Sequence, residues 1–231
     1  MGFFLDLVPD RILQLGITET VLASWIIMAL LFLFSLYLSP RFKLVPGYLQ
    51  AGLELIYEAV AGLLELMMGE EGSRHLPLVM TLALFITASN LMAILPGVTS
   101  PSEDINGPLA WALIVFFYLH FYSLREKGLI PYLKGYVEPS WLLLPINLLG
   151  ELAKPISLSF RLFGNIFGGG LVVAVVAMFF PWVVPVPLAA WFNLFIGLLH
   201  AFIFTMLTVA YLAVELTGHQ GREVEKDGRV K

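Results

Sequence analysis

ELAKPISLSFRLFGNIFGGG, residues 151–170, places three charged side chains inside an apolar run that extends over residues 141–180. The charged residues are Glu151, Lys154 and Arg161. A helix of 40 residues reaches roughly 60 Å at ~1.5 Å per residue, about twice the ~30 Å thickness of the hydrocarbon core of a bilayer. Such a helix must tilt steeply, bend or lie partly in the membrane plane, and its charges must face protein or water.

The composition is that of an integral membrane protein. Hydrophobic residues make up 59% of the 231 residues and charged residues 13%, well outside the averages of soluble domains. Apolar runs recur as far as residue 216 without a linker-like tract, which predicts one membrane domain over residues 1–231. The absence of cysteine excludes disulfides and thiolate metal sites, and no basic block suggests binding to nucleic acid.

The apolar runs predict an all-α protein with about five membrane helices, because backbone polar groups in lipid must be satisfied within the segment. The alternation typical of a membrane β-barrel is absent. Spans are expected over 20–38, 76–96 and 109–122. A hairpin of two long, steeply tilted helices, 141–180 and 186–216, is expected to follow.

The distribution of Lys and Arg predicts the orientation of the chain. With the N-terminal segment 1–19 outside, the inner segments hold ten Lys and Arg residues and the outer segments only Arg11, so the tail 217–231 is expected to lie in the cytoplasm. The acidic loop 97–107 is then outside. Residues 49–68 are expected to form an amphipathic helix on the inner surface or against a partner, and its acidic side chains favour packing on protein over binding to lipid.

Polar residues follow one side of each arm of the expected hairpin. At 100° per residue, one stripe comprises Asn147, Glu151, Lys154, Arg161, Asn165 and Gly168. The other comprises Asn193, Gly197, His200, Thr208, Tyr211 and Glu215, and both stripes are expected to face a shared feature. The GxxxG pair Gly164 and Gly168 is more typical of close helix packing than of function. An ion pair between Glu151 and Lys154 is expected, and the sequence supports a structural role and a functional role for it equally.

Arg161 is expected to be functional. An Arg near the membrane centre costs roughly 2.5–3.5 kcal/mol on insertion scales, and neither Glu151 nor Glu215, both toward the inner end, is an obvious partner. A partner must therefore supply the counter-charge. Since Arg keeps its proton at physiological pH, it can attract a carboxylate, make that carboxylate release its proton, and stop protons passing directly along the stripe.

The segments KPISLSFRLFGNIFGG (154–169) and LLHAFIFTMLTVAYLAVEL (198–216) closely resemble subunit a of bacterial F-type ATP synthases, and SNLMAILPG (89–97) and SPSEDING (100–107) are more weakly similar to it. The resemblance implies a non-catalytic, ion-conducting stator subunit in the bacterial inner membrane. Its tilted hairpin would face a ring of c subunits, beside peripheral-stalk b subunits and the rest of the synthase. Two offset half-channels would carry ions to and from the ring, with no cofactor or metal.

The resemblance also implies residue roles. Arg161 matches the essential arginine that faces the ring carboxylate, and His200 stands where many members have Gln. Many members carry titratable groups where this chain has Gly170 and Asn193. That departure leaves the outer relay, and the choice between protons and Na⁺, open. The residues expected to carry ion translocation are Arg161, Asn165, His200, Glu151, Asn147, Asn193, Asn90 and Asp104.

Other functions are less well supported by the residues. A secondary transporter could use Arg161 to bind an anionic substrate, but no inverted repeat or broken helix is evident. A membrane scaffold leaves Arg161 unexplained. An intramembrane enzyme is not favoured, because the sequence lacks a phosphate-binding GxxxxGK[ST], a zinc-binding HExxH and a GxSxG nucleophile motif.

Overall fold

The computed structural model describes residues 18–94, 98–137, 140–180 and 184–217, and these residues form helices and connecting turns without a strand. The α-helices are α2 (Glu19–Leu38), α3 (Tyr48–Met68), α4 (Leu76–Met92), α5 (Asn106–Lys127), α6 (Leu129–Val137), α7 (Leu144–Phe179), α8 (Pro185–Ala190) and α9 (Gly197–Thr217). Shorter 3₁₀ turns are η2 (Ser39–Arg41), η3 (Gly69–His75), η4 (Pro101–Glu103) and η5 (Trp141–Leu143), and η6 (Trp191–Ile196) is a π-helix. Most of the expected outer segment 1–19, part of the hairpin turn and most of the inner tail lie outside the described residues.

Five stretches of the described chain are long and apolar enough to cross a membrane, the last two being Trp141–Phe179 and Pro185–Glu215. The predicted fold class is confirmed, with all-helical structure, five candidate spans and two long C-terminal helices. α5 has 22 residues and exceeds the apolar run 109–122 at both ends. Apart from Leu124, its additional residues are polar, charged, Gly or Pro, so hydropathy alone does not detect them.

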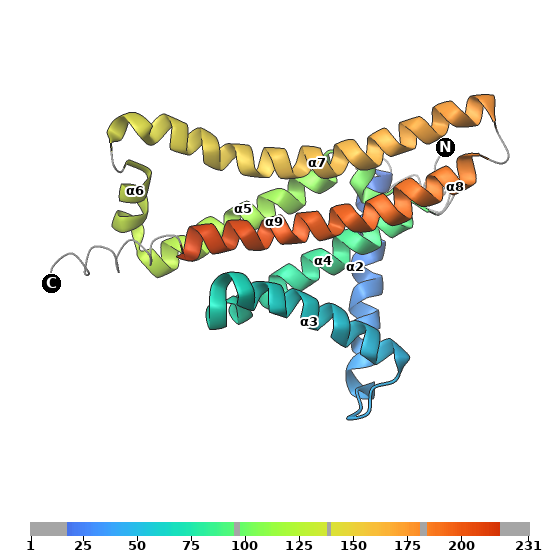
Figure 1. Ribbon diagram of the computed structural model, residues 1–231, viewed down its shortest axis with the longest axis horizontal. Helices are drawn as coiled ribbons and strands as arrows, with labels where there is room; N and C mark the ends of the chain where they lie inside the picture. The colour runs from blue at the N-terminus through green and yellow to red at the C-terminus, as the bar shows by residue number, and fades with distance from the viewer. Residues whose placement is uncertain (1–17, 95–97, 138–139, 181–183, 218–231) are drawn as a thin grey trace.

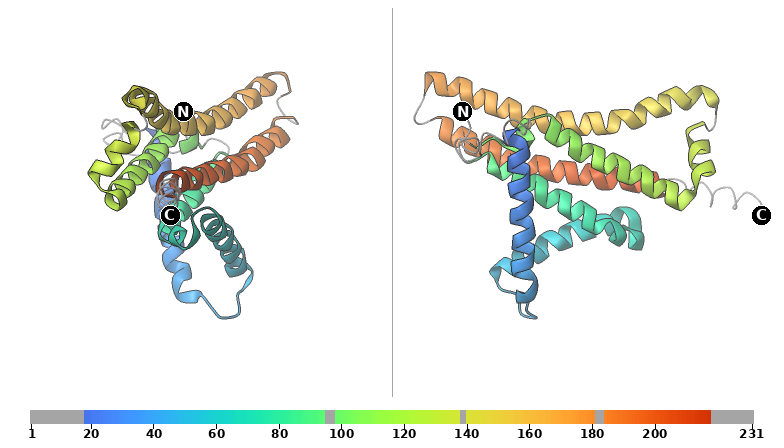
Figure 2. Two further views of the ribbon diagram at one scale, coloured as in Figure 1. Left: turned by 60° about the vertical axis from the view of Figure 1, so that its left-hand side comes forward. Right: turned by 180° about the vertical axis from the view of Figure 1, so that it is seen from behind.

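The long C-terminal helices lie side by side along the longest axis, and α2 crosses their direction (Figures 1 and 2). α9 occupies the middle of the fold, where it packs against α3, α4, α5 and α7. A bundle with this crossing cannot align all of its helices with one membrane normal. When α2 spans the bilayer, α7 and α9 are therefore inclined within it.

Apolar side chains from four helices form the interior around α9. One cluster joins α4, α5, α7 and α9 through residues that include Ile86, Trp111, Leu162 and Phe204. A second cluster joins the last turns of α3 to α4, α5 and α9. In α3, Val60, Leu64 and Met68 are buried at a spacing of four residues. The expected packing face of α3 is thus only partly used, since Ile56 and Tyr57 remain exposed.

The buried residues of α7 follow one stripe, in which Leu158, Leu162 and Ile166 recur every four residues. Gly169 continues this stripe, where an added Cβ would lie 2.7 Å from the Phe192 ring of η6. Gly164 and Gly168 have no neighbour within 4 Å of an added Cβ, so the GxxxG pair does not pack within the described chain. Close helix approach depends on Gly169, and the GxxxG pair remains on an open face of α7.

Candidate functional site

The centre of the hairpin contains a hydrogen-bonded group that joins α7 to α9. Asn165 Nδ2 donates one hydrogen bond to the Arg161 carbonyl oxygen at 2.7 Å and another to His200 Nε2 at 2.5 Å. His200 Nδ1 lies 2.8 Å from the Ile196 carbonyl oxygen, which can only accept. This arrangement assigns the proton of a neutral imidazole to Nδ1 and leaves Nε2 as the acceptor.

Arg161 is exposed and borders the buried stripe of α7. It lines a small hollow with His200, Ile203 and Phe204. Within the described residues, its guanidinium has no assigned ion pair or hydrogen bond. The exposed apolar residues Phe160 and Phe167 flank it along the same helix. A permanent charge on an apolar surface requires a counter-charge from outside these residues.

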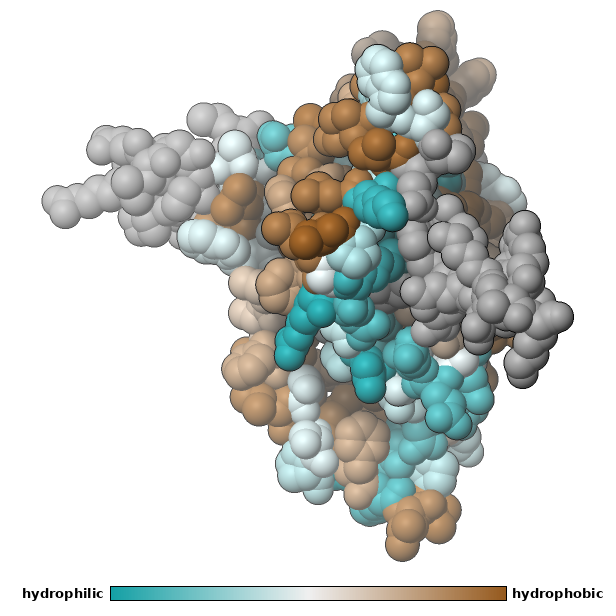
Figure 3. All heavy atoms as spheres, turned by 90° about the vertical axis from the view of Figure 1, so that its left-hand side faces the viewer, coloured by the Kyte–Doolittle hydropathy of each residue, from teal (hydrophilic) through white to brown (hydrophobic). Residues whose placement is uncertain are grey.

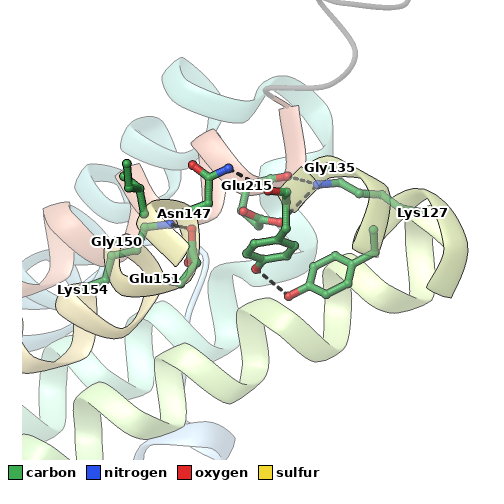
Figure 4. Close-up of a pocket in the computed structure, with 10 residues that line it drawn as sticks. Lys127, Gly135, Asn147, Gly150, Glu151, Lys154 and Glu215 are labelled. Carbon is green, nitrogen blue, oxygen red and sulfur yellow. Dashed lines mark hydrogen bonds and ion pairs between the residues drawn. The ribbon is translucent and has the colours of Figure 1, made fainter. Parts of the chain in front are cut away.

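A second group of candidate residues lines a cavity of about 520 Å³ at the N-terminal end of α7 (Figure 4). Asn147, Gly150, Glu151 and Lys154 of α7 line it together with residues of α5, α6 and α9. Lys154 Nζ contacts Glu151 Oε1 at 2.5 Å, while Glu151 Oε2 is buried without a hydrogen-bond partner among the described residues. The pair therefore leaves one carboxylate oxygen of Glu151 without a hydrogen-bond partner among the described residues.

Residues outside the predicted set complete this cavity. Lys127 at the end of α5 contacts the Glu215 carboxylate at 3.3 Å and also the Glu215 backbone carbonyl. Ser123 donates to the same carboxylate at 3.0 Å. Glu215 was expected in the polar stripe of α9 without a transport role. Its partners on α5 were missed because the contact joins residues 88 or more positions apart in the chain.

Helix α6 forms another wall of the cavity and was not predicted to contribute. Its Tyr132 hydroxyl lies 2.8 Å from the Tyr136 hydroxyl and 2.9 Å from His120 Nδ1. Asn147 Nδ2 donates to the Tyr136 carbonyl oxygen at 2.8 Å, which ties α6 to α7. Burial raises the pKa of Tyr132 and of Tyr136, so both hydroxyls keep their protons at neutral pH. The spacing of the two tyrosines, four residues apart in an apolar segment, was the available signal.

The end of the molecule that carries α6 is hydrophilic over much of its surface (Figure 3). Arg74 and Glu126 form an exposed ion pair there at 3.7 Å. The cavity lies near this end, because Lys127 and α6 directly follow Glu126 in the chain. The charged residues that line the cavity are therefore close to a hydrophilic surface.

The remaining candidate residues lie toward the opposite end of the hairpin. Asn90 is fully buried, donates to the Gly197 carbonyl oxygen at 2.7 Å and accepts from Ser102 Oγ at 2.5 Å. Asn193 Nδ2 donates to the Ala93 carbonyl oxygen at 2.8 Å. Both amides fasten α4 to the start of α9 and the π-helix before it. These hydrogen bonds stabilise the packing of α4 against α9 and the π-helix.

Asp104 closes the turn that precedes α5. Its Oδ1 accepts hydrogen bonds from Asn106 N at 3.1 Å and Asn106 Nδ2 at 2.9 Å. Its Oδ2 accepts from Thr20 Oγ1 at 3.1 Å, which attaches α2. The structure thus places the eight candidates in three groups, at the centre, around the α6 cavity and at the end near η4.

The polar stripe expected on α9 is divided. Asn193 contacts α4, His200 contacts α7 and Glu215 contacts α5. Asn193 departs from the stripe because it lies in the π-helix Trp191–Ile196. The wider turns of a π-helix change the direction in which its side chains point from that expected at 100° per residue. The two expected stripes still meet, at the bond between Asn165 and His200.

Comparison with known proteins agrees with this architecture. Residues 21–213 match the family model described as ATP synthase A chain. ATP synthase subunit a 2 of Bradyrhizobium sp. strain BTAi1 is 41% identical over 201 residues, covering 85% of this chain and 88% of the relative. ATP synthase subunit a of Moorella thermoacetica is 39% identical over 215 residues, covering 91% and 98%. The chain therefore belongs to the ATP synthase subunit a family, the multi-pass, non-catalytic membrane subunits of the bacterial synthase.

Proposed function

We propose that this chain is the ion-conducting stator subunit of a rotary ATP synthase, with Arg161 facing a carboxylate of the rotor ring. The observation that carries the proposal is the exposed Arg161 guanidinium, which has no assigned counter-ion among the described residues. Gly164 and Gly168 leave the same side of α7 open to close approach by another helix. The ring of c subunits supplies both the missing helix surface and the missing charge.

Arg161 controls the protonation of the ring carboxylate. An opposite charge within about 4–6 Å lowers the pKa of a carboxyl by about 1–3 units, so a protonated carboxyl that reaches Arg161 loses its proton. The guanidinium cannot take up that proton at physiological pH. It therefore separates the two access paths, and an ion crosses only when the ring turns.

Asn165 and His200 hold the surroundings of Arg161 in place. Asn165 uses both of its amide protons, one on the Arg161 carbonyl oxygen and one on His200 Nε2. A proton arriving at His200 would have to displace Asn165 from Nε2, because Nδ1 is bound to the Ile196 carbonyl oxygen. The imidazole of His200 is thus held at the α7–α9 contact beside Arg161.

The α6 cavity is the inner half-channel of this proposal. It contains Glu151, whose Oε2 lacks a partner within the described part of the chain, and Asn147 one turn earlier on α7. Arg161 follows Asn147 by 14 residues, which is roughly 21 Å along a helix at ~1.5 Å per residue. The outer half-channel approaches from the η4 end, past Asp104, Asn90 and Asn193. The two paths are thus offset along α7, on either side of Arg161.

The proposed orientation has the N-terminus outside and the C-terminus in the cytoplasm of a bacterial cell. The cavity then opens on the inner side, where Lys and Arg predominate in the sequence. Peripheral-stalk b subunits are the proposed further partners within the membrane. Protons are the proposed ion, and the specificity for protons over Na⁺ resides mainly in the ring carboxylate site.

The test is ATP-driven proton pumping by the complete synthase in inverted membrane vesicles, with and without Na⁺. Arg161→Ala should abolish pumping while the complex still assembles. Arg125→Ala, a matched control at the exposed inner end of α5, should pump within about twofold of the original protein. Coupled pumping retained by Arg161→Ala would refute the stator role, and Arg161-dependent uptake of an organic anion without ion pumping would favour a secondary transporter.

A further inference from the structure

The outer halves of the two long helices contain no side chain that can relay a proton. Between Arg161 and His200, the sequence has no acidic, basic or tyrosine residue. Asn193, which lies in this interval, commits its amide to the Ala93 carbonyl oxygen. A titratable group on the outer path must therefore come from another part of the chain.

The elements packed against the outer end supply few such groups. α4 contains no acidic or basic residue, and α5 contains none before His120. Among the described residues, the remaining candidates near this end are Glu19, at the start of α2, and Glu103 and Asp104. Asp104 accepts two hydrogen bonds that close the turn before α5 and a third from Thr20 of α2. Glu19 Oε2 accepts a hydrogen bond from Thr99 at 2.8 Å, while Glu19 Oε1 is buried with no partner among those of residues 18–217 that the structure describes.

Glu103 occupies the turn η4, which packs against α2, α4, α5 and α7. The carboxyl group is half-buried and interacts with the backbone of Ser100. Burial raises the pKa of Glu103 above its ordinary value, and the hydrogen bond with Ser100 opposes this shift only in part. The carboxyl can therefore bind and release protons closer to neutral pH than an exposed Glu does.

A buried hydrogen-bonded network leads from this turn to α9. The Ser100 hydroxyl lies 3.3 Å from the Ser102 hydroxyl, which donates to Asn90 Oδ1 at 2.5 Å. Asn90 Nδ2 in turn donates to the carbonyl oxygen of Gly197 at 2.7 Å. Ser100, Ser102 and Asn90 are each 0% exposed. The network ends three residues before His200 on α9.

A structural role explains part of this arrangement. Ser100 caps η4 by accepting from Ser102 N, and Ser-x-x-Glu is the pattern of a capping box, in which Glu reaches back to the backbone of the capping Ser. Gln serves this role equally well, because it also presents an acceptor oxygen. A capping role therefore accounts for the position of the side chain and leaves its half-buried, titratable carboxyl unexplained.

We propose that Glu103 is the proton-accepting carboxyl of the outer half-channel and delivers protons along the Ser102–Asn90 network toward His200. The inference rests on the proposed function. The Glu103 carboxylate takes a proton from the outer solution and becomes a neutral carboxyl. It then gives that proton to a water molecule ordered by the serine and asparagine side chains, and returns to carboxylate. Glu103 thus replaces the titratable groups that Gly170 and Asn193 do not provide.

The test uses the complete synthase in inverted vesicles, where the outer face of the membrane lines the lumen. ATP synthesis is measured without Na⁺ over a range of lumen pH, at a fixed pH difference and a fixed membrane potential, and is normalised to assembled complex. Glu103→Gln keeps the cap and removes the titratable group. In the original protein, the rate of ATP synthesis should decline as the lumen pH rises through the pKa of Glu103. Glu103→Gln should lower the rate at least fivefold and remove this decline.

Two further variants separate a relay from the alternatives. Glu103→Asp retains a carboxyl but weakens the cap, and should be more active than Glu103→Gln. Glu19→Gln, the matched control on α2, should synthesise ATP at a rate within about twofold of the original protein. If the negative charge at the outer surface were all that mattered, both substitutions would lower synthesis. A loss below fivefold in Glu103→Gln, an equal loss in Glu19→Gln, or Glu103→Asp no better than Glu103→Gln each overturns the inference. Arg161→Ala, run in parallel, tests the stator role separately.

Discussion

Two adjacent glycines of α7 should respond in opposite ways to the same substitution. An added Cβ at Gly169 would lie 2.7 Å from Cδ1, 2.9 Å from Cγ and 3.1 Å from Cβ of Phe192, whereas Gly168 has no neighbour within 4 Å. Overpacking of this kind costs about 1–3 kcal/mol, because the ring or the helix must shift. Alanine also gains about 0.5–1 kcal/mol over glycine in a helix interior. Gly169→Ala should therefore destabilise the subunit by up to about 2.5 kcal/mol, and Gly168→Ala should stabilise it slightly.

The measurement is reversible unfolding of the purified subunit in mixed micelles of lipid and SDS, followed by circular dichroism. Gly164→Ala is a second control, since it is equally open. The order of stability expected is Gly168→Ala and Gly164→Ala at or above the original protein, with Gly169→Ala below it. Equal stabilities for the variants at 168 and 169 would refute the reasoning that Phe192 and Gly169 set the approach of η6 to α7.

Three other predictions follow from the contacts described above. His200→Ala should impair coupled proton transport without eliminating it, since the substitution frees Asn165 but leaves the charge of Arg161; pumping assays on assembled complex would contradict this if transport were absent. Tyr132→Phe removes the hydroxyl that reaches His120 and should cost about 0.5–1.5 kcal/mol of unfolding free energy in the same micelles. Because burial raises the pKa of Glu103, its contribution to stability is present below the ordinary pKa of 4.5 and is lost as pH rises through the raised pKa. The unfolding free energy of Glu103→Gln, relative to that of the original protein, should therefore be higher at pH 8 than at pH 4. An equal difference at both pH values would contradict the assignment.

The long helices and the exposed Arg161 could be predicted because they depend on local properties of the chain. Hydropathy over tens of residues identifies the spans, and a helical period places Arg161 and Leu162 on different faces of α7. The burial of Leu162 and the exposure of Arg161 agree with that period. The expected hairpin also placed the polar stripes of its two helices toward a shared feature, and Asn165 and His200, which belong to these stripes, meet in the structure. These inferences needed only the helix repeat and the cost of burying charge.

The α6 cavity could not be predicted in the same way. Glu215 meets Ser123 and Lys127 across about 90 residues of chain, and Asn147 meets the backbone of Tyr136 across a turn. Such contacts depend on where α6 folds back, which is a tertiary property. The short segment 129–137 contains two tyrosines and a lysine among apolar residues, so its hydropathy favours neither a span nor a loop. Only the packing of α5 and α7 assigns it a position.

Two asparagines of the outer half, at or near the π-helix, donate hydrogen bonds from their side-chain amides to backbone carbonyl groups. A π-turn widens the helix and disturbs the regular hydrogen bonding of the backbone, so nearby carbonyl groups need partners from elsewhere. Asn90 supplies one to Gly197, directly after the π-helix, while Asn193 within the π-helix donates to the carbonyl oxygen of Ala93, the residue that follows α4. Amides used in this way can order water but cannot carry a net proton. In the proposed outer path, the carboxyl of Glu103 stands at the outer end of this region and the imidazole of His200 at its inner end.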